Sequence, residues 1–460
     1  MGSRAETRTG GRPATTGVIR GRYSLSVGNP ETPLPKQWRW TPLSDVARLE
    51  TGHTPSRKHP EYWGGDVPWI GIKDATDNHG RTIDDTYQHT NELGIDNSSA
   101  RILPKNTVCL SRTASVGYVV VMGRPMATSQ DFVNWVCSAA LDYRFLKYIL
   151  LAEREAFLRF SSGTTHQTVY FPEVKAFHVA LPPIAEQQAI SAMLSALDDK
   201  IELNRRMNET LESIARALFK SWFVDFDPVR TNAEGCDSGL PKRLANIFPD
   251  SFEDSEVGEI PRGWRVGHFG DVADNPRRGT SPNEIEPTTP YIALEHMPRK
   301  CIALSEWGTA DGVESGKFLF HAGEILFGKL RPYFHKVGVA PVEGVCSTDI
   351  LVVIPKSEDW FGFVLGHASG EAFVEYTNAG STGTKMPRTN WTDMARYAVA
   401  LPPERIAASF TELIRPVISR ILSSIHQSRT LAMLRNTLLP KLISGEVRLR
   451  DAERLVGGDV

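Results

Sequence analysis

Cysteine is scarce in this 460-residue sequence, and the five cysteines that occur are not grouped. Cys109, Cys137, Cys236, Cys301 and Cys346 are an odd number and form no CxxC pair. This usage argues against a disulfide framework and against a structural zinc site, and it is typical of a reducing compartment. The N-terminus also lacks the apolar stretch of a signal peptide, so we expect a cytoplasmic protein.

Long apolar runs are absent too. No stretch reaches the roughly eighteen apolar residues that a transmembrane helix requires. Hydrophobic residues make up 41% of the chain and charged residues 23%, as in soluble globular proteins. A chain of this length is expected to hold roughly two to four domains with cores of their own.

Catalytic signatures are missing as well. The sequence has no phosphate-binding Gly-rich loop, no GxSxG elbow and no HExxH pair, and its twelve histidines show no metal-ligand spacing. Two Leu-Pro-Pro motifs, beginning at Leu181 and Leu401, lack the polar first residue of an amino-methyltransferase motif. We therefore expect a chain without catalytic residues, without a metal site and without a cofactor of its own.

The chain has no excess of positive charge. Its formal net charge is −2. Residues 36–180 hold 16 Lys and Arg against 15 Asp and Glu, and residues 255–400 hold 14 against 18. Because nucleic-acid affinity depends strongly on neutralising phosphates, DNA binding would require local basic clusters or positive surface from a partner.

What the sequence does contain is a long segment suited to packing along another helix. After Leu181-Pro182-Pro183, about forty residues include neither proline nor glycine. Gaps of four and three alternate between the members of one stripe, which is the heptad seam of a coiled coil. The stripe consists of Ile190, Leu194, Leu197, Ile201, Asn204, Asn208, Leu211, Ala215, Leu218 and Trp222.

A second copy of this segment lies 220 residues later, after Leu401-Pro402-Pro403. Both stripes have two polar members at the same place, so antiparallel pairing would bring Asn204 near Ser428 and Asn208 near Ser424. Such pairs can fix the register of two helices by hydrogen bonding. The alternative is that these positions are exposed where the helices splay. The second stripe consists of Phe410, Ile414, Val417, Ile421, Ser424, Ser428, Leu431, Arg435, Leu438 and Leu442.

The rest of the chain is duplicated in the same way. Ser161–Pro183 aligns with Ser381–Pro403 without a gap. We therefore predict an α+β fold with two similar globular domains, each followed by a long helix. The helices are expected to pair as an antiparallel coiled coil with pseudo-twofold symmetry. The predicted layout is a disordered tail at 1–34, a first domain at 35–180, a helix at 181–224, a linker at 225–261, a second domain at 262–400, a helix at 401–445 and a C-terminal tail at 446–460.

Strand-like and helix-like patterns recur within both domains. In the first we predict a short helix at 45–49, strands at 67–72, 108–110, 117–122 and 132–137, and a helix at 142–160. In the second we predict strands at 325–328, 336–340 and 350–354, and a helix at 360–376.

Several motifs in this order resemble the specificity (S) subunit of type I restriction–modification systems. They include Tyr62-Trp63-Gly64-Gly65-Asp66-Val67-Pro68-Trp69-Ile70, Glu186-Gln187-Gln188-Ala189-Ile190, and Leu218-Phe219-Lys220-Ser221-Trp222-Phe223 followed by Asp225-Phe226-Asp227-Pro228. The Ser-x-Gly-Thr starts and Leu-Pro-Pro ends of both duplicated stretches, and the closing Leu-Leu-Pro-Lys-Leu-Ile-Ser-Gly-Glu, belong to the same pattern. The second helix departs from it by starting Glu404-Arg405-Ile406-Ala407.

The resemblance extends over nearly all of residues 35–449, and it implies a function. Each globular domain would be a target-recognition domain that reads one half of a bipartite, asymmetric DNA site. The helix pair would set the spacing between the halves and dock two methyltransferase (M) subunits, with restriction (R) subunits completing the complex. The S subunit itself would do no chemistry, because S-adenosylmethionine, ATP and Mg would act on the partner subunits.

Candidate DNA contacts lie in polar, Gly-rich loops that carry Arg, Lys, Ser, Thr and Gln, because these side chains suit base edges and phosphates. In the first domain they are Thr54, Ser56, Arg57, Lys58, Lys73, Arg112, Thr113, Gln130, Thr164, Thr165 and Gln167. In the second they are Arg277, Arg278, Thr280, Lys329, Arg331, Lys336, Thr384, Lys385 and Arg388. The aromatic residues Trp63, Trp69, Tyr291 and Trp391 are interpreted as core residues rather than base-stacking residues.

Two other functions fit parts of the pattern. A single-chain methyltransferase or nuclease would require a cofactor or metal motif, which the sequence lacks. A coiled-coil adaptor without DNA contact would not change target choice when residues 36–180 are exchanged.

Overall fold

The computed structural model of the chain describes residues 17–161, 167–381 and 386–449. The chain divides into two compact units, and both divisions fall inside the long helices, at 199/200 and at 431/432. Unit 1 comprises the described residues up to 199 and from 432 onward, and unit 2 comprises residues from 200 to 431. None of the described helices has the combination of length and hydropathy that a bilayer crossing needs.

Unit 1 contains three sheets, and its larger core includes parts of the two long helices, α7 (Ile184–Phe223) and α14 (Glu404–Ser444), while Ile70 of the third sheet belongs to a smaller, separate core. The sheet orders are β1-β2-β12-β3, β4-β11-β8-β9-β6 and β10-β5-β7. Its other elements are β1 (Ile19–Arg20), β2 (Leu25–Val27), β3 (Arg39–Pro42), α1 (Leu43–Val46), β4 (Ala47–Thr51), η1 (Pro60–Tyr62), β5 (Trp63–Ile70), α2 (Ile72–Asp77), β6 (Thr82–Ile83), β7 (His89–Thr90), α3 (Glu92–Asp96), β8 (Val108–Ser111), β9 (Val119–Met122), β10 (Ala127–Thr128), β11 (Phe132–Cys137), α4 (Tyr143–Ala152), α5 (Arg154–Phe160), α6 (Phe171–Lys175) and β12 (Phe177–Leu181).

The central sheet of unit 1 follows from its apolar runs. Strand β9 is an unbroken Val-Val-Val-Met run, and all four side chains are fully buried, as expected of a strand covered on both faces. The predicted strand at 132–137 is confirmed as β11. The short helix predicted at 45–49 is correct only in part, because α1 ends at Val46 and from Ala47 onward the chain pairs with β11 over five residues as β4.

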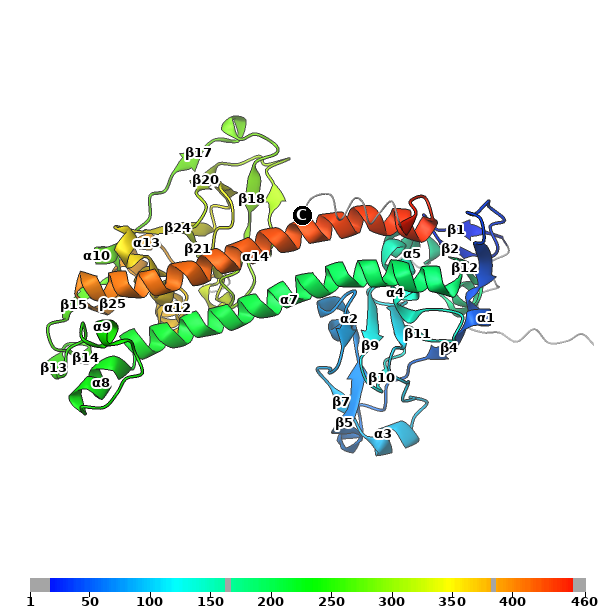
Figure 1. The fold of residues 1–460 in the computed structure, drawn as a ribbon, viewed down its shortest axis with the longest axis horizontal. Coiled ribbons are helices and arrows are strands. Elements are labelled where there is room, and N and C mark those ends of the chain that lie inside the picture. Colours follow the sequence, from blue (N-terminus) through cyan, green and yellow to red (C-terminus); the bar gives the residue numbers. More distant parts are fainter. Residues whose placement is uncertain (1–16, 162–166, 382–385, 450–460) are drawn as a thin grey trace, which may run out of the picture. The chain divides into compact units, whose positions relative to one another are not determined.

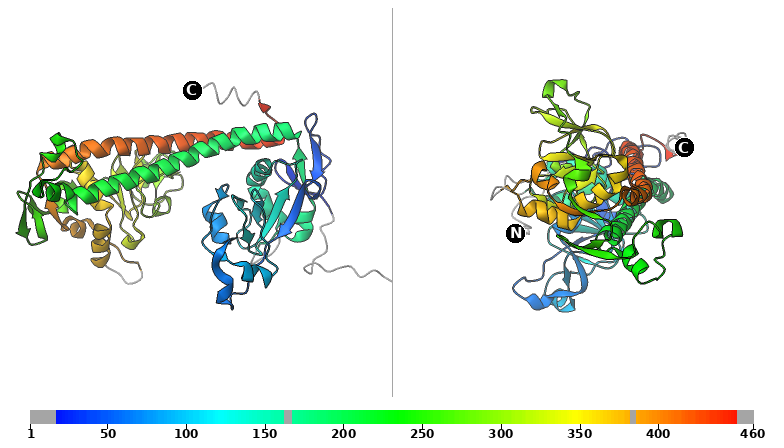
Figure 2. Two further views of the ribbon diagram at one scale, coloured as in Figure 1. Left: turned by 60° about the horizontal axis from the view of Figure 1, so that its bottom comes forward. Right: turned by 90° about the vertical axis from the view of Figure 1, so that its left-hand side faces the viewer.

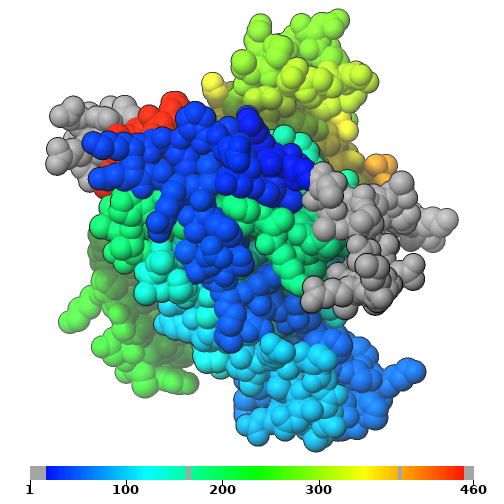
Figure 3. Space-filling view, turned by 90° about the vertical axis from the view of Figure 1, so that its right-hand side faces the viewer, coloured from blue at the N-terminus to red at the C-terminus, as the bar shows by residue number. Residues whose placement is uncertain are grey.

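The predicted disordered tail is wrong for residues 17–34. Leu25 and Val27 are 1% exposed, and their strand β2 pairs with β12. The Glu153 carboxylate accepts hydrogen bonds from four consecutive backbone N–H groups, those of residues 22–25. Figure 3 shows the segment in blue on the surface of unit 1, beside the red C-terminal end of α14. Glu153 also lies between α4 and α5, so the predicted helix at 142–160 is two helices.

Unit 2 repeats this plan with a larger number of short elements. Its sheet orders are β16-β24-β21-β22, β17-β20-β23-β18-β19, β15-β25 and β13-β14. Besides its parts of α7 and α14, the elements are α8 (Asp227–Ala233), α9 (Lys242–Ala245), β13 (Phe252–Ser255), β14 (Gly258–Pro261), β15 (Arg265–His268), α10 (Phe269–Val272), β16 (Ala273–Asp274), β17 (Gly279–Thr280), η2 (Pro282–Glu284), β18 (Pro290–Ile292), η3 (Leu294–His296), β19 (Gly308–Thr309), β20 (Lys317–Phe320), β21 (Ile325–Gly328), η4 (Pro332–Phe334), β22 (Val337–Val339), β23 (Gly344–Cys346), β24 (Ile350–Pro355), η5 (Glu358–Trp360), α11 (Phe361–Ala368), α12 (Glu371–Ala379), α13 (Trp391–Ala395) and β25 (Ala398–Leu401).

The segment predicted as a linker, 225–261, is folded onto unit 2. Phe226, Val229 and Phe248 are buried in the core of this unit. The Asn232 side chain ties α8 to α9 by donating to the carbonyls of Ala245 and Phe248, at 3.1 and 3.2 Å. The segment connects the first helix to the second globular part, but its apolar residues give it a structure of its own.

The two long helices are antiparallel within each unit (Figures 1 and 2). In unit 1, Asp198 of α7 pairs with Arg435 of α14 at 2.7 Å, and Glu186, near the start of α7, pairs with Arg448, just beyond the end of α14, at 3.1 Å, so the two helices run in opposite directions. In unit 2, Asn204 contacts the 424–428 region and Trp222 packs on Phe410, with ring centroids 5.4 Å apart. The predicted α+β fold with an antiparallel helix pair is therefore confirmed.

Candidate nucleic-acid interface

In unit 1, loops that are far apart in the sequence are joined by backbone hydrogen bonds into one group, here called the loop frame. Arg112 follows β8, and its N–H donates to the carbonyl of Asp131 at 2.7 Å. Its own carbonyl accepts from the N–H of Val169 at 2.9 Å. The N–H of Ser129, in turn, donates to the carbonyl of Ile70 at 2.9 Å. The predicted contact loops at Arg112 and Gln130, and the chain next to Gln167, therefore start from one place.

Unit 2 contains the same loop frame with other side chains. Lys329 follows β21, and its N–H donates to the carbonyl of Asp349 at 2.9 Å while its carbonyl accepts from Thr389 at 3.1 Å. Ser347 donates to Ile292 at 2.9 Å, as Ser129 does to Ile70. The two units thus present different residues from one backbone arrangement.

In unit 1 the frame gathers Thr54, Arg112, Thr113 and Gln130. The Arg112 guanidinium donates to the carbonyl of Gln130 at 3.0 Å and lies 4.6 Å from the ring of Phe171. Burial lowers the pKa of Arg112 from its usual value, although the group remains a cation at neutral pH. Thr54 hydrogen-bonds the Gln130 side chain, and the Thr113 hydroxyl donates to Asp131 at 2.5 Å.

Gly52 brings the 52–58 loop onto this frame. A Cβ atom at Gly52 would lie 1.9 Å from the carbonyl oxygen of Ser129, so no other residue fits this approach. The next residue, His53, donates its N–H to the carbonyl of Thr128 at 2.9 Å. The loop that holds Thr54, Arg57 and Lys58 is therefore anchored to the frame by a backbone contact, and Thr54 contacts Gln130 of the frame.

Arg57 lies over an aromatic platform in the same loop. Its guanidinium is 3.8 Å from the ring of Trp63 and 5.1 Å from that of Trp69, and it donates to the Gln88 side chain at 2.7 Å. Trp69 is buried, in agreement with its interpretation as a core residue. Trp63 is only half-buried, so part of its ring lies at the surface. Ser56 and Lys58 are exposed.

Lys73 stands on α2, outside the loop frame. Its ammonium group lies 3.9 Å from the ring of Tyr87, whose hydroxyl donates to Asp77 at 2.9 Å. Gln167 is exposed at the edge of the described chain. Thr164, Thr165, Thr384 and Lys385 lie outside the described residues.

In unit 2 the frame gathers Lys329, Arg331 and Arg388. Leu330 and Arg388 form an antiparallel β-bridge, and the N–H of Arg331 donates to the carbonyl of Pro387 at 2.7 Å. Arg388 forms an ion pair with Asp349 at 3.3 Å and keeps about half of its side chain exposed. Arg331 has a φ of +51°, a backbone conformation that is strained for a non-glycine residue and common at functional loops.

The other predicted residues of unit 2 lie elsewhere. Arg278 makes two hydrogen bonds to Glu324, at 2.9 and 2.8 Å, and this partner raises the pKa of Arg278. Thr280 donates to Glu284 at 3.3 Å, and Lys336 is half-buried with its ammonium group on the carbonyl of Leu294. Arg277 is exposed in the irregular segment that precedes β17. The structure thus gives Arg278 and Lys336 partners within the chain.

The polar seam positions are brought together in unit 2. The Asn204 amide donates to the Gln427 side chain at 2.9 Å, to the Ser428 hydroxyl at 3.2 Å and to the Ser424 carbonyl at 3.5 Å. Asn208 is buried, and its side-chain oxygen has no partner among the described atoms, while the Ser424 hydroxyl turns to the Arg420 carbonyl. The pattern of seam positions found Asn204 and Ser428, but it missed Gln427, which lies one position off the seam.

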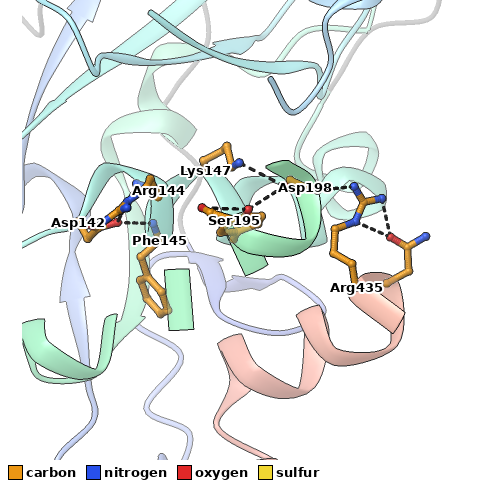
Figure 4. Close-up of polar contacts among 9 residues, drawn as sticks. Asp142, Arg144, Phe145, Lys147, Ser195, Asp198 and Arg435 are labelled. Carbon is orange, nitrogen blue, oxygen red and sulfur yellow. Dashed lines mark hydrogen bonds and ion pairs between the residues drawn. The ribbon is translucent and has the colours of Figure 1, made fainter. Parts of the chain in front are cut away.

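In each unit a carboxylate of α7 attaches the globular part to a long helix; Glu212 is buried, and the Asp198 side chain is 21% exposed. In unit 1, Asp198 of α7 accepts from Tyr148 at 2.7 Å and from Arg435 of α14 at 2.7 Å, and its contact with Lys147 is 3.5 Å (Figure 4). Burial lowers the pKa of Lys147 and raises that of Tyr148. In unit 2, Glu212 of α7 accepts from the backbone N–H groups of Ile302 and Ala303, each at 3.0 Å. Neither carboxylate was expected from the sequence, because its partners are distant in the chain.

Comparison with known proteins gives concordant results. Residues 35–213 match the family model of the type I restriction modification DNA specificity domain. The chain is 28% identical over 431 residues to the type I restriction enzyme MjaIX specificity subunit of Methanocaldococcus jannaschii, covering 91% of this chain and 95% of that protein. It is 25% identical over 392 residues to the HindI specificity subunit of Haemophilus influenzae, covering 71% and 84%. The crystal structure of a type I S subunit from M. genitalium aligns with a TM-score of 0.52 at 14% identity, covering 90% of this chain and 98% of that one, which supports the fold.

Proposed function

Because this chain is similar to type I restriction–modification specificity subunits over most of its length, we propose that it is a specificity subunit whose two loop frames read the two halves of a bipartite DNA site. DNA recognition for a type I system is the function of this family. The proposal that each unit reads its own half-site is supported by the loop frame, which occurs in both units with different side chains. Arg112, Gln130 and Thr54 occupy it in unit 1, and Lys329, Arg331 and Arg388 occupy it in unit 2. Because the two frames present different side chains from the same backbone arrangement, we expect the two half-sites to differ in sequence.

The chemistry of these side chains fits base reading. Arg and Lys suit guanine edges, and Gln suits adenine, in the major groove. Arg57 over Trp63 and Arg388 beside Asp349 are held in place, so less conformational entropy is lost when they contact DNA. The near-balance of charge in each globular part argues that the isolated chain binds DNA weakly and that its partners add phosphate contacts.

The helix pair is proposed to act as a spacer and a docking element. The Asn204 amide, with its three partners on α14, would set the register of the pair. Half-sites read on one face of DNA would have centres about one helical turn apart, roughly 34 Å. Two methyltransferase subunits would dock on this element, bring S-adenosylmethionine and take the target base out of the duplex. Restriction subunits would add ATP- and Mg-dependent cleavage.

An exchange of one globular part tests this proposal. Residues 35–180 are replaced by the corresponding residues of another specificity subunit, and methylated bases are mapped across the genome of cells that also express the methyltransferase subunit. We expect one half-site to change while the other half-site and the spacer stay the same. A target that does not change would contradict DNA reading by unit 1, and a target that changes in both halves would contradict a division between the units.

A further inference from the structure

The two units differ in how one sheet edge is covered. In unit 1, strand β12 is paired on both edges, with β3 on one side and β2 on the other. In unit 2 the corresponding strand β25 pairs with β15 alone, as far as the described residues go. The register is the same, since Leu181 is opposite Arg39 and Leu401 is opposite Arg265. One edge of β25 is therefore left without a strand.

A cavity of about 500 Å³ lies beside this open edge. Its lining includes residues 398–400 of β25, aromatic side chains from the end of α7, and apolar side chains from the start of α14. The turn between α11 and α12 supplies Ser369 and Gly370, and Glu371 begins α12. Burial lowers the pKa of His367, another lining residue, to about 3, so this side chain is uncharged at neutral pH.

In unit 1 the equivalent space is filled by strand β2. Leu25 and Val27 belong to the core of that unit, and the Ser24 hydroxyl donates to the carbonyl of Ile443. The Ala180 N–H donates to the Ser24 carbonyl at 3.0 Å. With the 220-residue offset, the residues around β2 correspond one by one to lining residues of the cavity. The pairs are Ile190 with Phe410, Leu194 with Ile414, Leu439 with Phe219, Ile443 with Phe223, and Ala180 with Ala400.

The chain segment that precedes β15 does not fill this space. It forms the hairpin β13-β14, whose strands pair with each other and, in the described residues, with no other strand. Val257 and Ile260 of the hairpin line the cavity from one side. Because Ala400 holds the position of Ala180 in the same register, its N–H points to the open edge.

We propose that this cavity, together with the open edge of β25, binds an extended segment of another protein as an added strand. The occupant carries aliphatic side chains at alternate positions, like Ser24-Leu25-Ser26-Val27 in unit 1. Main-chain hydrogen bonds to β25 give affinity, and the apolar walls select the alternate side chains. A second copy of this chain is the poorer occupant, because Glu153 holds its own β2 by four N–H groups. The inference does not depend on the proposed DNA function.

A peptide with the sequence of residues 22–29, Arg-Tyr-Ser-Leu-Ser-Val-Gly-Asn, is the probe. Binding of the fluorescently labelled peptide to the full chain is measured by anisotropy, and hydrogen exchange of the Ala400 amide is followed with and without peptide. The blocking variant is Ala372→Trp, at an exposed lining position of α12. Ala379→Trp is the matched control, because it is exposed on the same helix and does not line the cavity. Thermal unfolding of both variants checks their folding.

We expect saturable binding with a Kd below about 1 mM. Ala372→Trp should weaken binding at least about tenfold, Ala379→Trp should leave it unchanged, and peptide should protect the Ala400 amide. A peptide in which both aliphatic residues are replaced by Asp should not bind. Absence of binding to the wild-type chain would overturn the proposal. Equal binding to Ala372→Trp would also overturn it, since the peptide would then occupy another place, such as the β2 position of unit 1.

Discussion

Glu212 offers the sharpest test of how a globular part is held on its helix. The side chain is 6% exposed and accepts from two backbone N–H groups, those of Ile302 and Ala303. Ala303 also bridges to Val339 of β22, so this carboxylate ties α7 to a sheet of unit 2. A hydrogen bond to a charged acceptor contributes about 1.5–3 kcal/mol. Glu212→Ala would leave both donors buried without a partner, and the local cost should therefore be about 3 kcal/mol or more.

Native-state hydrogen exchange measures this cost locally. We expect Glu212→Ala to lower the protection of the Ile302 and Ala303 amides by about 100-fold, since 1.4 kcal/mol corresponds to a factor of ten. Glu209→Ala is the matched control, because Glu209 is 58% exposed and pairs with Arg205 on the surface of the same helix. Its effect should stay below about 1 kcal/mol. Unchanged protection of both amides in Glu212→Ala would refute the reasoning.

Three further predictions concern other parts of the chain. Glu153→Ala should release residues 17–27 and allow trypsin to cut at Arg20 and Arg22. Glu155→Ala, which removes only a surface ion pair, should not have this effect. Equal cleavage rates in the two variants would contradict the role of Glu153 in holding this segment. The pKa of His367 is lowered to about 3 from 6.5, so the unfolded state binds the proton first as the pH falls. Stability of unit 2 should therefore decline from pH 6.5 towards pH 3. The fall in the pKa limits this loss to about 5 kcal/mol, and the position of the side chain at the cavity makes it smaller; His367→Phe should flatten the decline in denaturation curves. Insertion of one heptad into both long helices, about 10 Å, should widen the spacer of the methylated target by about 3 bp, and an unchanged spacer would exclude the ruler model.

The long helices could be predicted because their signal is local and repetitive. The seam spacing, the absence of helix breakers in the first copy and the matched polar positions together indicated an antiparallel pair, and Asn204 does meet Ser428. The structured N-terminal segment could not be predicted in this way. Strand β2 has only two aliphatic residues, and its partners, β12 and Glu153, lie more than a hundred positions away.

The grouping of loops in each loop frame could not be predicted from the sequence either. Composition marked Arg112, Gln130, Lys329 and Arg388 as candidates one at a time. Their grouping depends on backbone hydrogen bonds such as those between Arg112 and Asp131, for which the sequence carries no local pattern. The ion pair between Arg278 and Glu324 could not be predicted either, although it makes the Arg278 guanidinium less available to DNA. Gly52, by contrast, fits a rule that can be read in advance, because glycine often marks a close approach of two backbones.

If each loop frame reads its own half-site, single substitutions in the two frames should affect different halves of the target. Methylated bases are mapped in cells that express Arg112→Ala, Lys329→Ala or the control Lys105→Ala, which alters an exposed residue outside the frame. Loss of one base contact corresponds to about 1–3 kcal/mol of discrimination. We predict that Arg112→Ala relaxes base preference in one half-site only, that Lys329→Ala relaxes it in the other only, and that Lys105→Ala changes neither. Relaxation of the same half-site by both frame variants, or of no position by either, would contradict the account.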